Sequence, residues 1–148
     1  MNKIHLNFLD LKTFTEQDVL DYCQINNIGP DNIKELYLSF NKLTDISGIK
    51  LFKNLEKLAL MENQLTDISI IQYLNKLEVL YISGNQITNI SVLKYLKNLK
   101  SLYIQKLRLE SDQVQYINNL KNLKTLFCYN GFKDMSVLKQ INKKIKIY

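Results

Sequence analysis

The sequence predicts an α/β fold assembled from repeated units, each with a short strand and a tight convex segment. Three observations support this prediction: the chain recurs with a period close to 22 residues, one stretch of each unit alternates apolar and polar residues, and the following residues are apolar at every third position. A strand with one buried face has a period of two, whereas a period of three fits a 3₁₀ or similarly tight segment. Both kinds of element are therefore expected in each unit.

Residues 1–32 are expected to form an N-terminal cap, because a stack of repeats would otherwise expose an apolar end. The stretch KIHLNFLDL can add one strand with Ile4, Leu6 and Phe8 pointing the same way.

A helix is predicted over residues 15–27. Thr15 is placed to cap it by accepting a hydrogen bond from the backbone near Asp18. The Gly-Pro pair at positions 29 and 30 then ends the helix. Its apolar side is formed by Val19, Leu20, Tyr22 and Cys23.

Five repeats are predicted across residues 33–142. In the stretch LYLSFN, Leu36 and Leu38 alternate with the outward-facing Tyr37 and Ser39. The steps between successive starts are 22, 22, 22, 24 and 22 residues if a sixth start is included. These starts are Ile33, Leu55, Leu77, Leu99 and Leu123, with Ile145 as the sixth. The convex segment of the first unit has its apolar residues at Leu43, Ile46, Ile49, Phe52 and Leu55.

An Asn is expected to bond free backbone groups where the chain leaves each strand and turns. The residues assigned to this role are Asn41, Asn63, Asn85 and Asn130. Leu107 interrupts the series in the fourth unit, and two extra residues follow between Leu109 and Val114. The stretch SDQVQYINNL predicts a true α-helix there, capped by Ser111 or Asp112.

Residues 143–148 predict a terminal strand in which Ile145 and Ile147 alternate with lysines. Charged residues on such a strand discourage pairing with another chain. A chain of 148 residues with 46% hydrophobic content is enough for one domain with its own core.

The repeated pattern LxxLxLxxN, with its convex spacing, resembles the leucine-rich repeat family over residues 33–148. The similarity is to the 22-residue class found in bacterial internalins and in eukaryotic phosphatase-regulating repeat proteins. This resemblance implies a right-handed solenoid with a parallel sheet on its concave face. It also implies that the concave face binds another protein.

Little in the sequence favours an enzyme, a metal site or a cofactor. His5 is the one histidine, and no nucleophile motif, glycine-rich phosphate loop or metal-ligand spacing occurs. Cys23 and Cys128 are far apart in sequence and are expected to be buried thiols. The sequence therefore predicts a non-enzymatic protein without cofactors.

The N-terminal stretch lacks the continuous apolar run of a signal peptide. No run in the chain approaches the roughly 18 apolar residues needed to span a bilayer. A cytoplasmic monomer is expected, with export by an unrecognised route left open. The abundance of Lys, Asn and Ile favours an AT-rich, bacterial source.

The outward strand positions are the candidate binding surface. The position between the two buried strand residues holds an aromatic residue in four of the five units, with Ala59 as the exception. Aromatic residues are frequent at binding hot spots, although cross-strand aromatic contacts can also simply stabilise a sheet. An adaptor or an inhibitor of a partner protein would both use such a face. The residues assigned to partner binding are Tyr37, Met61, Tyr81, Tyr103, Gln105, Lys106, Phe127 and Tyr129.

Nucleic acid or another polyanion is the alternative partner. Residues 1–93 have a net charge of −3 and residues 94–148 of +9, so the basic C-terminal half could contact phosphates while aromatic residues stack on bases. Many of these lysines are expected in or beside convex segments, away from the aromatic positions. They include Lys94, Lys97, Lys121 and Lys139.

Overall fold

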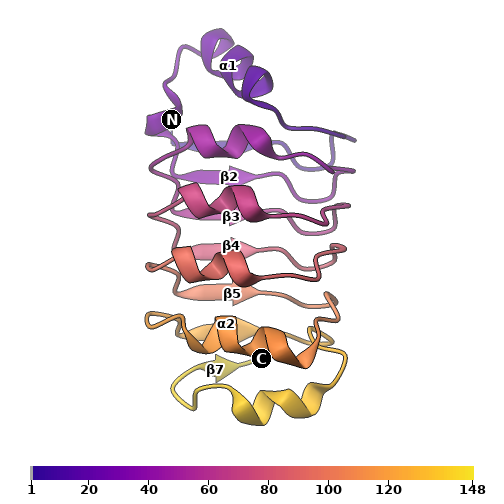
Figure 1. The fold of residues 1–148 in the computed structure, drawn as a ribbon. Helices are drawn as coiled ribbons and strands as arrows, with labels where there is room; N and C mark the ends of the chain where they lie inside the picture. Colours follow the sequence, from indigo (N-terminus) through magenta and orange to yellow (C-terminus); the bar gives the residue numbers. More distant parts are fainter. Residues whose placement is uncertain (1) are drawn as a thin grey trace.

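The computed structural model describes residues 2–148 and contains a seven-stranded parallel sheet whose strand order follows the sequence. Figure 1 shows the strands stacked one above another along the length of the molecule. Each strand is two or three residues long, and most have one buried residue between two partly exposed ones. The strands are β1 (Lys3–His5), β2 (Glu35–Tyr37), β3 (Lys57–Ala59), β4 (Val79–Tyr81), β5 (Ser101–Tyr103), β6 (Thr125–Phe127) and β7 (Lys146–Ile147).

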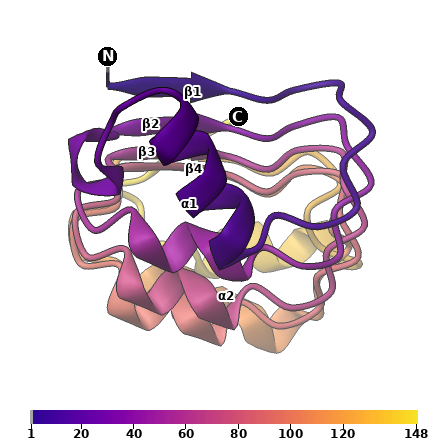
Figure 2. The same ribbon diagram turned by 90° about the horizontal axis from the view of Figure 1, so that it is seen from above.

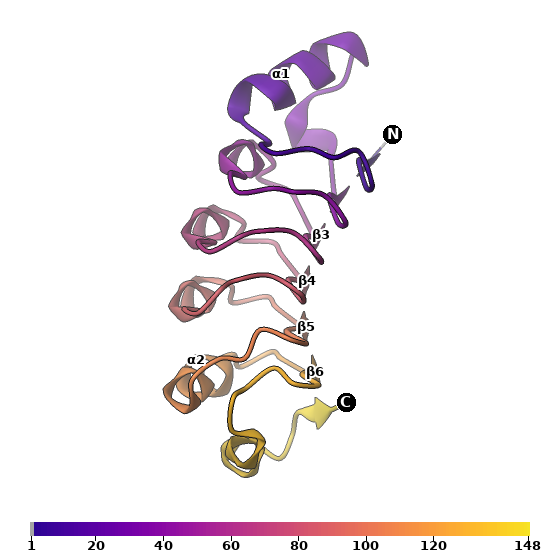
Figure 3. The same ribbon diagram turned by 90° about the vertical axis from the view of Figure 1, so that its right-hand side faces the viewer.

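Helical segments form the second layer, against one face of the sheet. Seen from above, most of them lie on one side and the strands on the other, while the helix of residues 16–25 crosses the end of the stack between the two layers (Figure 2). Seen from the side, the strand edge of the stack is concave and the helical edge is convex (Figure 3). This arrangement confirms the predicted solenoid. The segments are α1 (Glu16–Ile25), η1 (Pro30–Asn32), η2 (Ser47–Leu51), η3 (Ser69–Tyr73), η4 (Ser91–Tyr95), η5 (Ser111–Gln113), α2 (Val114–Asn118) and η6 (Met135–Gln140), where η denotes a 3₁₀ helix.

The core runs the length of the stack without a break. Equivalent leucines pair in register from strand to strand, as in Leu36 with Leu58 and Leu58 with Leu80. The predicted convex positions are also buried, with Ile46 no more than 3% exposed and Phe52 fully buried. Because each unit covers only one side of its neighbour, no single unit could bury these residues alone.

Three asparagines hold the turns after the strands, as predicted, and we call Asn41, Asn63 and Asn85 the amide ladder. The Asn63 side-chain nitrogen donates to the carbonyls of Leu38 and Leu60, at 3.0 and 3.1 Å. Its side-chain oxygen accepts from the Leu43 amide at 3.0 Å. Each amide thus joins backbone groups of two neighbouring units.

The assignment of Asn130 to this ladder is wrong. Asn130 lies one residue too early in its turn and has a left-handed backbone with φ of 50°. Gly131 occupies the ladder position, where an added Cβ would lie 2.8 Å from the Cys128 carbonyl oxygen and 3.1 Å from that of Ile104. The backbone approaches too closely at this turn for an Asn side chain.

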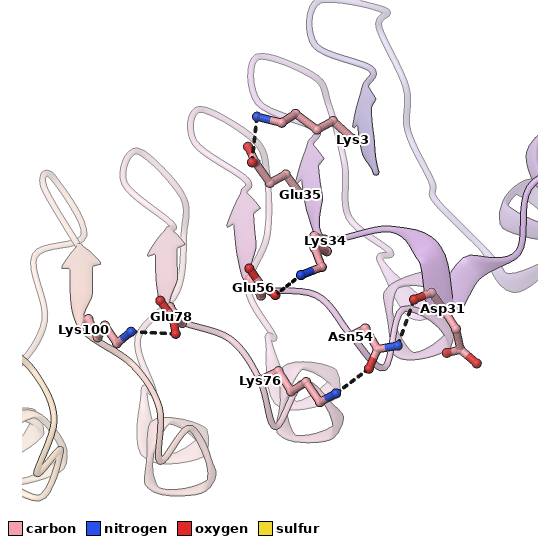
Figure 4. Close-up of polar contacts among 9 residues, drawn as sticks. All are labelled: Lys3, Asp31, Lys34, Glu35, Asn54, Glu56, Lys76, Glu78 and Lys100. Carbon is pink, nitrogen blue, oxygen red and sulfur yellow. Dashed lines mark hydrogen bonds and ion pairs between the residues drawn. The ribbon is translucent and has the colours of Figure 1, made fainter. Parts of the chain in front are cut away.

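A second series of asparagines, which sequence reasoning missed, lies at the opposite edge of the sheet. The side-chain nitrogens of Asn54 and Asn98 donate to the carbonyls of Asp31 and Asn75, both at 2.8 Å. Lys76 replaces the Asn in the intervening unit, and its Nζ donates to the Asn54 side-chain oxygen at 2.7 Å (Figure 4). The signal was present in the sequence as an Asn directly before Leu55, Leu99 and Leu123.

The N-terminal cap is built largely as predicted. Thr15 and Asp18 form a reciprocal capping box at the start of α1. Val19 and Cys23, one helical turn apart, are buried against the first repeat. Two positions were predicted wrongly: Leu20 is 50% exposed and Phe8 is 72% exposed. Only one narrow side of α1 contacts the stack, and β1 ends before Phe8 can point inward.

The fourth convex segment contains the predicted α-helix, α2, but not the predicted cap. Neither Ser111 nor Asp112 caps α2, which begins directly from the 3₁₀ turn η5 without a side-chain cap. Gln113 is buried within this turn, and its side-chain oxygen accepts from the Ile90 amide at 3.0 Å. The two extra residues therefore bring a buried side chain into contact with the preceding unit.

None of the helices formed by residues 2–148 has the length and apolar character that a membrane span requires.

Candidate functional site

The outward positions of the strands form one line across the concave face, which we call the aromatic column. The parallel register places equivalent residues side by side, as in Tyr81 with Tyr103 and Tyr103 with Phe127. Sequence reasoning identified the middle of this line but missed both ends, because the end strands lie outside the five clear repeats. The column consists of His5, Tyr37, Ala59, Tyr81, Tyr103, Phe127 and Tyr148.

Four rings at the C-terminal end of the column form a continuous stack. The ring centroids of Tyr81 and Tyr103 are 4.1 Å apart, those of Tyr103 and Phe127 are 4.2 Å apart, and those of Phe127 and Tyr148 are 4.6 Å apart. Burial within the stack is the main reason that the pKa of the Tyr103 phenol is raised. The inner phenol therefore stays neutral throughout the physiological pH range.

The column is interrupted at Ala59, and Lys57 lies across the gap. Its Nζ atom is 5.3 Å from the centroid of the Tyr37 ring and 5.5 Å from that of Tyr81. Interaction with the Tyr37 side chain raises the pKa of Lys57, so its amine is protonated and positively charged at neutral pH. Beyond the gap, Tyr37 stacks on His5 with centroids 4.4 Å apart.

The next outward column contains Ser39, Met61, Ser83, Gln105 and Tyr129, and much of it is bonded within the sheet. The Ser83 hydroxyl donates to the Gln105 side-chain oxygen at 2.6 Å and accepts from the Gln105 amide at 3.0 Å. Tyr129, by contrast, is 69% exposed. Among the predicted binding residues in this column, the Gln105 side chain is already hydrogen-bonded to Ser83. Met61 and Tyr129 are therefore more available to contact a partner.

A rim of residues with left-handed backbone borders this second column. Phe8 and Phe40 stack there with centroids 4.6 Å apart. Farther along, Lys106 reaches past Gly84 to form an ion pair with Glu62 at 3.3 Å. The predicted binding residue Lys106 therefore belongs to the rim and is paired within the chain. The positions with positive φ on this rim are Phe8, Phe40, Glu62, Gly84, Lys106 and Asn130.

Both cysteines of residues 2–148 are buried free thiols. Burial raises the pKa of both Cys23 and Cys128, so their thiolates are disfavoured at neutral pH. Residues 2–148 contain no group of three or more His, Cys, Asp or Glu side chains that could hold a metal ion. Among the basic residues of the C-terminal half, Lys94 lies over the convex Tyr95 ring, 5.0 Å from its centroid.

Two family models match the sequence. One, described as "Leucine rich repeat", matches residues 31–87, and the other, described as "Leucine Rich repeats (2 copies)", matches residues 75–114. Together they span more than half of the chain. A comparison with curated protein sequences gives no significant match.

Several solved structures are similar in fold. An internalin, InlF, from Listeria monocytogenes is 32% identical with a TM-score of 0.70 over 78% of this chain. A leucine-rich repeat protein from Leptospira interrogans is 21% identical with a TM-score of 0.71 over the whole chain. The chain covers 34% of the InlF chain and 42% of the Leptospira chain. Internalin C2 from L. monocytogenes is 24% identical with a TM-score of 0.62; the alignment covers 99% of this chain and 73% of that one.

Proposed function

The chain belongs to the leucine-rich repeat family, and on that premise we propose that it is a non-enzymatic module that binds a partner protein through the aromatic column. Domains of this kind are typically protein-binding modules. The stack from Tyr81 to Tyr148 carries the proposal, because it forms a line of rings along the strands, whose edge of the stack is concave (Figure 3). Each such ring can bury about 150 to 250 Å² of surface.

Stabilisation of the sheet accounts for part of this stack but not for all of the exposed aromatic surface. Tyr129 is 69% exposed, lies beside the stack and adds little to the packing of the sheet. Tyr37, Tyr81 and Phe127 are only half-buried, so each keeps accessible ring surface. Aromatic side chains lose little conformational entropy on binding and are frequent among hot spots, where truncation often costs about 2 kcal/mol or more.

When bound to its partner, the protein acts either as an adaptor or as an inhibitor that covers part of the partner's surface. The chain covers 34% of the InlF chain, so the activities of longer relatives do not transfer as a whole. An inhibitor needs no second binding surface, whereas an adaptor needs one. The convex Tyr73 and Tyr95, 54% and 46% exposed, are the aromatic residues available for a second surface.

Affinity capture from the native cell tests the proposal. The protein is immobilised as wild type, as Tyr81→Ala/Tyr103→Ala, and as the convex control Tyr73→Ala/Tyr95→Ala, with folding checked by circular dichroism. The concave variant is expected to lose a specific protein that the wild type and the convex control both retain. Equal capture by all three folded proteins would overturn the proposal.

Salt dependence separates the polyanion alternative from protein binding. Contacts with phosphates release counterions, so binding of nucleic acid falls steeply as salt rises. Protein binding through the aromatic column is expected to change less than about tenfold between 50 and 200 mM salt, against about 10³-fold or more for a site with many phosphate contacts. Capture that is abolished at 200 mM salt and by nuclease treatment would favour the alternative.

A further inference from the structure

The gap in the aromatic column at Ala59 is a slot with a defined shape. Tyr37 and Tyr81 lie on β2 and β4, which are separated by β3, so their rings are about 9.6 Å apart at the usual strand spacing. Ala59 provides the floor between them. The resulting cavity has a volume of about 260 Å³, below the roughly 300 Å³ at which pockets for drug-sized ligands begin. Its lining includes Tyr37, Phe40, Lys57, Ala59, Met61 and Tyr81.

We propose that this slot receives one aromatic side chain of the partner protein, and that a carboxylate next to that side chain pairs with Lys57. The inference rests on the proposed function, since it specifies what the partner presents to the concave face. It names an acidic, aromatic segment as the feature that the slot selects.

The width of the slot matches one ring. The Lys57 Nζ atom lies in the gap, 5.3 and 5.5 Å from the two ring centroids, so its flexible side chain must swing outward to admit a ring. A ring then placed midway between Tyr37 and Tyr81 would lie about 4.8 Å from each, given the strand spacing. The rings elsewhere in the column stack at 4.1 to 4.6 Å. An inserted ring would therefore complete the column with nearly the geometry that the chain already uses.

The charges around the slot favour a carboxylate. Within residues 2–148, Lys57 forms no ion pair, whereas the equivalent Glu35 on β2 is already bonded to Lys3 and to the Tyr37 hydroxyl. His5 lies on the far side of the Tyr37 ring and adds no negative charge. Lys57 would repel an arriving cation, whereas an anion would meet an ammonium group that interacts with the Tyr37 side chain but forms no ion pair within residues 2–148.

The rim beside the slot is apolar and locally strained. Phe8 and Phe40 have φ of 60° and 59°, a left-handed conformation that glycine adopts easily and bulky residues rarely adopt. They are nonetheless 72% and 44% exposed. Phe40 lines the slot and Phe8 stacks on it, so the pair extends the apolar surface that an inserted ring would meet.

Three dipeptides test the slot by nuclear magnetic resonance, with the Ala59 methyl signal as the readout. N-acetyl-Asp-Phe-amide presents a ring and a carboxylate, N-acetyl-Asn-Phe-amide lacks the charge, and N-acetyl-Asp-Ala-amide lacks the ring. The first is expected to shift the Ala59 signal saturably. The second should bind about two- to fivefold more weakly, as for a partly exposed ion pair, and the third should give no saturable shift.

Two variants make the test specific. Ala59→Tyr supplies the missing ring from the chain itself and should abolish dipeptide binding while the protein stays folded. Lys57→Met keeps the aliphatic stem and should remove the preference for Asp over Asn. No saturable shift in the wild type, or undiminished binding to folded Ala59→Tyr, would overturn the inference.

Capture of the native partner distinguishes the two proposals. If Tyr81→Ala/Tyr103→Ala loses the partner and Ala59→Tyr also loses it, both stand. If the first variant loses the partner and Ala59→Tyr keeps it, the protein binds through the aromatic column but the slot inference is wrong. If neither variant loses the partner, the proposed function itself fails.

Discussion

The turn after each strand is bonded to a neighbouring turn in one way in the first three units and in another way in the last two. In the first three, a buried Asn side chain joins the turn of each unit to the unit or cap segment before it. In the last two, Leu107 and Gly131 stand at this position, and the backbone itself makes the connection: the Leu109 amide donates to the Gly131 carbonyl at 2.8 Å. A solenoid can therefore lose its amide ladder where two turns come close enough to pair directly.

This difference explains why the fourth unit tolerates its irregular sequence. Lys106 and Arg108, on either side of Leu107, both have left-handed backbone, with φ of 63° and 57°. The altered turn buries Leu107, which is 6% exposed, and pairs Leu109 with Phe132 in an isolated bridge. The break in the ladder is a repacked turn and not an open site.

The largest expected effect is in the regular half. Asn63→Ala should destabilise the protein by about 3 kcal/mol, because the Leu43 amide loses its acceptor and a buried, unpaired donor costs about 1 to 3 kcal/mol before the lost packing is counted. Urea denaturation measures the change. Asn98→Ala is the matched control, since it removes one exposed hydrogen bond and should cost less than about 1 kcal/mol. Equal losses in both variants would show that the ladder has no special role.

Gly131→Ala is the corresponding test in the irregular half. The added Cβ would lie 2.8 Å from the Cys128 carbonyl oxygen, which is backbone and cannot move aside. We expect a loss of about 2 kcal/mol, within the range of about 1 to 3 kcal/mol for overpacking. Gly29→Ala is the control, because its Cβ would meet Asn32 at an ordinary 3.5 Å. A stable Gly131→Ala protein would mean that close backbone approach is not what replaces the ladder.

Leu107→Asn asks whether the ladder can be restored in the fourth unit. The new side chain would be placed to accept from the Ile87 amide, worth about 0.5 to 1.5 kcal/mol, but the buried Leu, worth about 1.5 to 3 kcal/mol, would be lost. The variant should be about 1 kcal/mol less stable in urea denaturation. A gain in stability would instead indicate that the turn readily returns to the regular form.

The smallest expected effect is at the rim. Lys106→Ala removes an ion pair whose side chains are 64% and 43% exposed, so the loss should be no more than about 0.5 kcal/mol. In about 1 M salt, where charges are screened beyond about 3 Å, the difference from wild type should vanish. Thermal denaturation at low and high salt, with Lys12→Ala as the unpaired control, measures this. A larger loss that persists in salt would contradict a purely electrostatic role.

Much of the fold could be predicted because each element depends on residues close together in the sequence. The strands, the 3₁₀ segments and the helix α2 each follow from apolar spacing within one unit. The errors concern single positions. Asn130 was assigned wrongly because it lies one residue before the ladder position, close enough to resemble the repeat pattern in the sequence. In the structure its backbone is left-handed, as at the other rim positions.

The candidate surface was less predictable, because it depends on side chains that meet across units. The sequence alone was enough to predict the repeats, the line of outward aromatic residues and the missing ring at Ala59, since each is a matter of position within a period. Only the folded stack shows that His5 and Tyr148 extend this line, and that Lys57 bridges Tyr37 and Tyr81. The physical reason is that these contacts join residues about one or two repeats apart, or strands at the ends of the stack. Their geometry is set by how whole units pack and not by the sequence of any one of them.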